Sequence, residues 1–386
     1  MQKKNQIFTV FIIIGLAAFL WNSVLAAPAN QLESPYFSYF PVITQAEPPY
    51  ISYFPIIAQA EPTPTQPPAV PPAYYTTSWY MTPLSVTTTY AKGCAAGNQT
   101  KTVAGAQDGL IILDYGQPWS DGIQYGTLLL TEPTYNLNST NDIMVYTRNF
   151  INGYMACSDG ISTIDIGIGT TNYVYYIGEE NCYGQNWFCT TGRAYNHGKA
   201  WAQMVLSMHN WVAQQGYAAQ VTVSGATDIE LSWNYATVSR AWVDGFDDFD
   251  NDTVIFYNYG TCDGCPTRLA PKDDPDLVWD WTMSDVHYTA WRAGAVWPIP
   301  EIYDNEGILA RQWAYLSKWG VSRGYTRMYF LSALTQMQAC IGNSDPHCSY
   351  LDNTPVQAWH QLHDELNYWP ETAQYTIPWM TDIDWP

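Results

Sequence analysis

The chain has 386 residues, a formal charge of −20, and 13% charged side chains against 16% aromatic ones. An acidic surface repels phosphate backbones and anionic lipids, so the composition argues against nucleic acid and anionic membranes as partners. With so few charged side chains, the polar surface must consist largely of Asn, Gln, Thr, Ser and Tyr, which suits a neutral, hydroxyl-rich ligand.

The first 26 residues have the pattern of a secretory signal peptide. Lys3 and Lys4 precede an apolar run over residues 7–20, and Val24-Leu25-Ala26 supplies the small residues of a cleavage site. A retained membrane anchor is the alternative, but the run is shorter than the roughly 20 residues that a span needs. We therefore predict a secreted, extracellular or cell-surface protein that is not inserted in a membrane after cleavage. Loss of the two lysines would change the formal charge to −22.

Residues 27–73 combine a tandem repeat with a proline-rich linker. The repeat is PYFSYFPVITQAEP (35–48) followed by PYISYFPIIAQAEP (49–62), and TPTQPPAVPPA (63–73) comes next. Two short copies cannot stack into a repeat domain, and prolines bracket every apolar cluster. We expect a mostly disordered, extended stalk. The alternative is attachment to a cell surface or a partner through residues 35–62.

Residues 74–386 are expected to form one α/β domain. Apolar, β-branched runs predict strands at Leu110–Leu113, Thr163–Ile168, Val221–Val223, Thr253–Tyr257, Val296–Ile302 and Met328–Leu331. Less distinct strands are expected at Thr127–Leu130 or Ile143–Tyr146, and near Gln374–Ile377. Helical patterns fall at His197–Gln215, Tyr235–Val243, Ser284–Ala293, Glu306–Lys318 and Thr354–Leu366. This alternation and length predict a (β/α)8 TIM-type barrel; an open doubly wound sheet is the alternative, although no Gly-rich phosphate loop follows a strand.

Eight cysteines in an exported chain indicate disulfide bonds. Sequence neighbours suggest three local pairs, Cys182–Cys189, Cys262–Cys265 and Cys340–Cys348, which would leave Cys94 and Cys157 for each other. This pairing is a hypothesis, because connectivity does not follow from sequence alone.

The strongest chemical signal is Asp228 and Glu230, which are separated by one residue at the end of an apolar run. This spacing places both carboxyl groups on one face of a strand. Like-charge repulsion and burial would raise the pKa of Glu230, so we expect Glu230 to act as a catalytic acid and Asp228 to orient it. Asp114, at the end of an earlier strand, would be the base or would stabilise a cationic transition state.

Further acids and aromatic residues fall near predicted strand ends, where the active sites of barrels lie. The expected substrate-binding residues are Trp119, Asp165, Trp233, Tyr257, Tyr259, Trp297 and Glu301. Acids that protonate and attack a glycosidic bond, together with aromatic faces that stack on sugar rings, are what glycoside hydrolysis requires. A lone Asp at a strand end, or Glu301 before a helix, is equally a candidate for a helix cap.

In order along the chain, LDYG (113–116), DIE (228–230), FYNYG (256–260) and VWPIPEIY (296–303) resemble the motifs of secreted TIM-barrel muramidases of glycoside hydrolase family 25. The chain is also similar to uncharacterised exported glycoside-hydrolase-like barrels. The resemblance implies that Glu230 is the catalytic acid, with Asp114 and Asp228 in the same cluster.

The sequence therefore predicts a secreted glycoside hydrolase that acts on a cell-wall or extracellular polysaccharide such as peptidoglycan. The alternative is a non-catalytic glycan-binding or cell-surface structural protein on the same scaffold. We expect no cofactor and no metal. The acidic run at 244–252 lacks the central Gly and the terminal Glu of an EF-hand loop, and no third ligand is evident beside His360 and His363.

Overall fold

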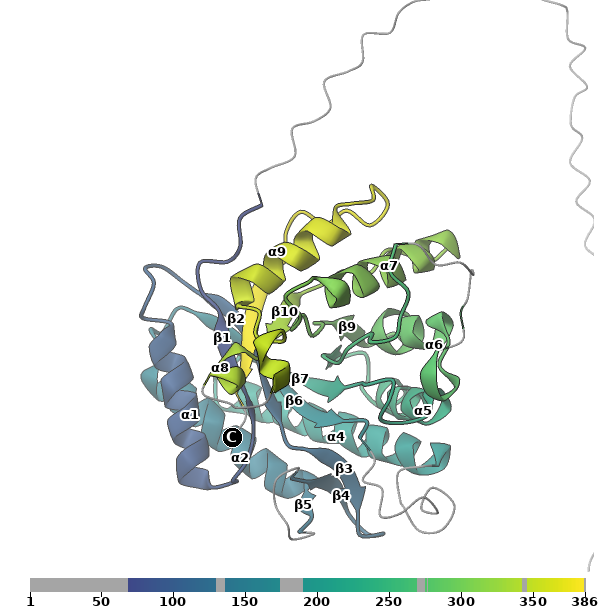
Figure 1. Ribbon diagram of the computed structural model, residues 1–386. Coiled ribbons are helices and arrows are strands. Elements are labelled where there is room, and N and C mark those ends of the chain that lie inside the picture. The colour runs from purple at the N-terminus through teal and green to yellow at the C-terminus, as the bar shows by residue number, and fades with distance from the viewer. Residues whose placement is uncertain are drawn as a thin grey trace, which may run out of the picture. The chain divides into compact units, whose positions relative to one another are not determined.

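The computed structural model describes residues 69–129, 136–173, 190–268, 275, 277–341 and 346–384 (Figure 1). The predicted signal peptide, the tandem repeat and the Cys182–Cys189 pair lie outside these residues. No helix within the described ranges is long and apolar enough to span a membrane.

Eight strands form one parallel sheet. They are β1 (Thr76–Tyr80), β2 (Asp108–Asp114), β6 (Thr163–Thr171), β7 (Val221–Asp228), β8 (Phe256–Asn258), β9 (Val296–Pro298), β10 (Ser332–Thr335) and β11 (Trp379–Asp384). Their order in the sheet is β10-β11-β1-β2-β6-β7-β8-β9. Each strand is therefore parallel to its neighbours in chain order, as in a TIM-type barrel.

The two ends of this sheet meet just after β9. Ile302 donates a backbone hydrogen bond to Leu334 O at 2.9 Å, and the Leu334 amide donates to Pro300 O at 2.9 Å. Glu301 and Leu334 form a parallel bridge at this point. The sheet thus closes into a ring through residues 300–302, which confirms the predicted TIM-type fold.

The longer helices pack around the barrel, between successive strands (Figure 1). They are α1 (Val86–Gln99), α2 (Thr140–Cys157), α4 (Thr191–Gln214), α5 (Ala236–Asp247), α7 (Ile308–Ser322) and α9 (Pro355–Leu366). Two shorter helices are α6 (Met283–His287), followed by a π-helical turn at Tyr288–Arg292, and α8 (Met337–Cys340). The apolar stripe predicted for α4, at Trp201, Val205, Met208 and Val212, is fully buried. Burial of such stripes against the strands supplies most of the stabilising apolar contact.

The structure corrects the start of the predicted barrel. Thr76–Tyr80 is the first strand, so Asp114 ends the second strand rather than the first. Ile143–Tyr146 lies in α2, because a capping box between Ser139 and Asp142 begins a helix there. The other candidate for this strand, Thr127–Leu130, overlaps β4 (Tyr125–Leu128), which pairs antiparallel with β3 (Gln117–Ser120) and β5 (Asn138–Ser139) in a separate small sheet.

Three of the predicted disulfides are present: Cys94–Cys157, Cys262–Cys265 and Cys340–Cys348. The first joins α1 to the end of α2. These two helices approach so closely that a Cβ atom on Gly93 would lie 2.0 Å from the Phe150 carbonyl oxygen. The disulfide and the glycine therefore fix the same helix pair.

Candidate active site

A cavity of about 900 Å³ opens at the carboxyl ends of the barrel strands. We call it the acidic cavity, because seven of the residues lining it are acidic and no described lining residue is Lys, Arg or His. Five residues predicted from the sequence line it: Asp114, Asp228, Glu230, Trp233 and Glu301. The tripeptide 228–230 and Asp114 thus share one cleft, as expected.

The barrel itself positions these acids. Asp114 and Asp228 are the last residues of β2 and β7, and Glu301 lies in the closing segment after β9. Asn172 fixes the backbone of Glu230 from both sides: its Oδ1 accepts from the Glu230 amide at 3.0 Å, and its Nδ2 donates to the Glu230 carbonyl at 2.9 Å. The side chain of Glu230 is therefore presented from a backbone that cannot easily shift.

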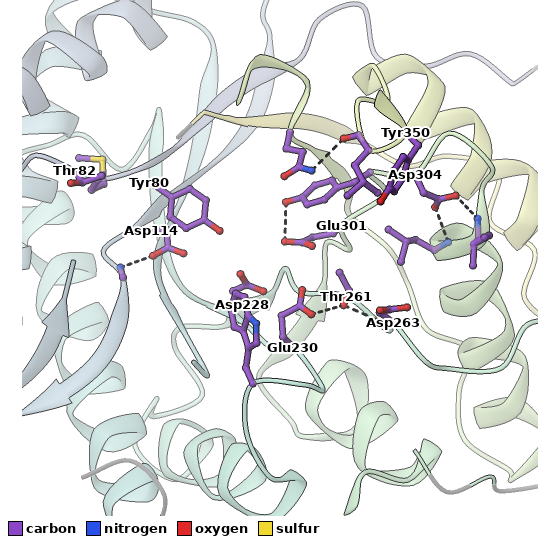
Figure 2. A pocket seen from close by; sticks show the side chains of 18 of the residues that line it. Tyr80, Thr82, Asp114, Asp228, Glu230, Thr261, Asp263, Glu301, Asp304 and Tyr350 are labelled. Atoms are coloured by element: carbon purple, nitrogen blue, oxygen red, sulfur yellow. Dashed lines mark hydrogen bonds between the residues drawn. The ribbon is translucent and has the colours of Figure 1, made fainter. Parts of the chain in front are cut away.

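Asp228, Glu230 and Glu301 form what we call the acidic trio (Figure 2). One carboxylate oxygen from each lies within 4.8 Å of those of the other two. The Thr261 hydroxyl donates to Glu230 Oε2 at 2.9 Å, and the Tyr303 hydroxyl donates to Glu301 Oε1 at 2.8 Å. Asp228 Oδ1, by contrast, is buried and has no hydrogen-bond partner.

Burial shifts every acid of this group in the same direction. Desolvation raises the pKa of Glu230 to about 7 and the pKa of Asp114 to about 6. The pKa values of Asp228 and Glu301 are raised well above their ordinary range, first by burial and then by the neighbouring carboxylates. Part of the trio therefore stays protonated at neutral pH, which is the condition for general acid catalysis by a carboxyl group.

The spacing of the trio would also let a divalent cation bridge its oxygens. The raised pKa values of the three acids also fit carboxyl groups that keep protons at neutral pH. We interpret the trio as carboxyl groups that are partly protonated. The expectation of no metal stays a prediction.

No protein family model and no curated protein matches the chain. The resemblance to family 25 muramidases is thus not shown. A sugar phosphate isomerase/epimerase from Parabacteroides distasonis is similar with a TM-score of 0.37 and 10% identity, over 81% of this chain and 89% of its own. A GH5-4 broad-specificity endoglucanase from an uncultured bacterium is similar with a TM-score of 0.39 and 8% identity, over 84% and 91%. Evidence for the function of this chain therefore has to come from its own site.

Tyr259 does not line the cavity but supports Asp114 from beneath it. Its hydroxyl donates to Asp114 Oδ2 at 2.6 Å and lies 3.0 Å from the Thr170 carbonyl oxygen. The Gly116 amide donates to the other Asp114 oxygen at 2.6 Å. Both bonds favour the ionised carboxylate, so they hold its pKa lower than burial alone would.

Replacing Tyr259 with Phe should therefore raise the pKa of Asp114 further. The pH dependence of the unfolding free energy reports this pKa, because the folded and unfolded states bind protons differently. In the wild type, the unfolding free energy falls as pH rises towards the folded-state pKa of Asp114. In Tyr259→Phe we expect this fall to continue to higher pH. Repeating the comparison in an Asp114→Asn background is the control: a shift that persists there would not come from Asp114.

Four other residues predicted to bind substrate do not line the acidic cavity. Asp165 is the third residue of β6, near its amino end, and accepts hydrogen bonds from Tyr257 and Ser224 inside the barrel. Trp297 packs edge-on against Trp291, at a second cavity of about 410 Å³. Trp119 belongs to β3, in the small antiparallel sheet. The error arose because the sequence pattern located strands without fixing which of their residues lie at the carboxyl ends.

Four residues at the site were not predicted from the sequence: Tyr80, Asn172, Thr261 and Tyr303. Tyr80 ends the strand that was not recognised. Thr261 and Tyr303 lie two residues beyond Tyr259 and Glu301, so the same spacing that singled out Asp228 and Glu230 would have found them.

Proposed function

We propose that this chain is a glycoside hydrolase in which Glu230 and Glu301 are the catalytic pair. The supporting observation is the pair itself: two carboxyl groups within 4.8 Å at the mouth of a barrel, in a cavity large enough for a glycan. An ordinary helix cap explains neither side chain, since each accepts its hydrogen bond from a side-chain hydroxyl group.

The two carboxyl groups differ in environment, which assigns their roles. Glu301 is 5% exposed and Glu230 is half-buried, so Glu301 keeps its proton to higher pH and Glu230 ionises first. Glu301 would then protonate the leaving oxygen while Glu230 attacks the sugar carbon. Such a short separation leaves no room for a water between the groups and corresponds to retention of configuration. This assignment reverses the role that the sequence suggested for Glu230.

Asp114 and Asp228 complete the proposed site. Asp228 lines the cavity, and its Oδ1 accepts no hydrogen bond from the described residues of the protein. A substrate hydroxyl group would donate to this side chain. Asp114 lies at the same mouth, where its charge would stabilise a cationic transition state. Trp233 adds an aromatic side chain to the lining, for stacking on a sugar ring.

The test is hydrolysis of a panel of extracellular polysaccharides that includes peptidoglycan, with new reducing ends as the readout. We expect at least one member to be cleaved by the wild type and not by Glu230→Gln. Secretion, which the signal-peptide pattern predicts, would place such substrates within reach. Binding without cleavage, unchanged by Glu230→Gln, would instead support a glycan-binding protein.

A further inference from the structure

The acidic cavity has two chemically different ends. The carboxyl groups of the trio and Asp114 occupy one end, and Ile308, Leu309, Tyr350 and Leu351 line the other; we call these four residues the apolar wall. In the view of Figure 2, Tyr350 lies on the opposite side of Glu301 from Asp114. Glu301 thus stands between the two ends.

Two polar side chains near the apolar wall, Asp304 and Gln336, are engaged within the protein, whereas Glu306 is exposed. Asp304 accepts from the Ile308 and Leu309 amides at 2.8 and 2.9 Å, one bond to each of its carboxylate oxygens, and so caps α7. The side-chain amide of Gln336 donates to Leu351 O at 3.3 Å. A sugar at this end would find few free partners for its hydroxyl groups, whereas Asp228 at the other end has an unused oxygen.

The apolar wall is nevertheless held in place by hydrogen bonds, and it lines the cavity. Its two segments are tied together, because the Asn305 amide donates to Tyr350 O at 3.0 Å and the Asn353 side chain donates to Asp304 O at 2.7 Å. The Cys340–Cys348 disulfide constrains the chain two residues before Tyr350. Ile308 is 40% exposed and Tyr350 is 48% exposed, and both residues line the cavity.

We propose that the apolar wall binds the leaving group of the substrate, and that the substrate is a glycoside of an apolar alcohol, such as a glycolipid. This inference rests on the proposed function and narrows it from glycans at large to amphipathic glycosides. Glu301, the proposed acid, would protonate the oxygen between sugar and aglycone, so an aglycone on its far side lies where the wall is. Water leaving the wall on binding supplies the affinity.

The activity test compares octyl and methyl glycosides of one sugar. Each methylene moved out of water is worth about fourfold in an equilibrium constant, so three buried methylenes predict a preference in kcat/KM of about 60-fold for the octyl compound. Ile308→Asp should lower this preference at least about tenfold. Val356→Asp is the matched control, since Val356 is 43% exposed in the first turn of α9 and does not line the cavity.

A binding test separates this inference from the proposed function. The neutral fluorophore N-phenyl-1-naphthylamine should bind the full chain and be displaced by octyl but not by methyl glycosides. Ile308→Asp should abolish this binding and Val356→Asp should preserve it. Such binding without hydrolysis of any glycoside would overturn the proposed function alone. Equal turnover of both glycosides, or probe binding indifferent to Ile308→Asp, would overturn the apolar wall as the aglycone site.

Discussion

Glu230→Gln should lower kcat/KM for a cleaved glycan by at least about a thousandfold, since replacing a catalytic carboxyl group removes most of its contribution. Glutamine keeps the shape of the side chain and can still accept from Thr261 Oγ1. Binding, measured by calorimetry or by retention on the insoluble glycan, should therefore change little. Glu301→Gln should have a comparable effect on turnover.

The two roles can be separated chemically. In Glu230→Gly, added azide should attack the sugar carbon of an activated glycoside in place of the carboxylate, as the bond to the leaving oxygen breaks. The product would be a glycosyl azide of inverted configuration. In Glu301→Gly, azide should instead intercept the glycosyl-enzyme intermediate and give a retained product. NMR of the products decides, and the opposite pattern would restore Glu230 as the acid.

Glu306→Gln is the matched control for these substitutions. Glu306 also lines the cavity but is exposed, and its replacement should alter kcat/KM by less than about threefold. Full activity of Glu230→Gln would contradict the catalytic assignment. It would leave the cavity as a binding site at most.

The barrel could be predicted from the sequence because its longer strands and helices carry their own patterns. The apolar run that ends at Asp228 and the stripe of α4 are examples, and both are buried as expected. The first strand, Thr76–Tyr80, was not predicted because it is short and because its inward-facing residues Thr76 and Ser78 are polar. Their hydroxyl groups bond to neighbouring strands: Ser78 Oγ and Thr381 Oγ1 lie 2.7 Å apart. No apolar alternation reveals such a strand.

The site was predicted in part for a related reason. Asp228 and Glu230 stand out because their spacing is local, whereas the pairing of Glu230 with Glu301 depends on closure of the ring between β9 and β10. Asn172 was missed because its role is to hold the Glu230 backbone from 58 residues away. Contacts of this range depend on strand order and register, which sequence patterns constrain weakly.

Asp114→Asn should stabilise the folded chain at pH 8 by on the order of 3 kcal/mol. Burial raises the pKa of Asp114 from 3.8 to about 6, and about 1.4 kcal/mol corresponds to each pKa unit. Between these two values the folded state binds more protons than the unfolded state. The unfolding free energy therefore falls as pH rises through this window, and above it the whole penalty is present.

Asparagine suits this position because its oxygen can accept from the Gly116 amide, and its amide can donate to Tyr259, whose hydroxyl can turn to Thr170 O. The stabilisation should be seen in urea unfolding at pH 8 and should vanish below about pH 3, where the wild-type carboxyl group is largely neutral in both states. Asp263→Asn, at an exposed position in the same cavity, should show neither effect. An equal gain at both pH values would mean that asparagine packs better, and that the buried charge of Asp114 does not limit stability.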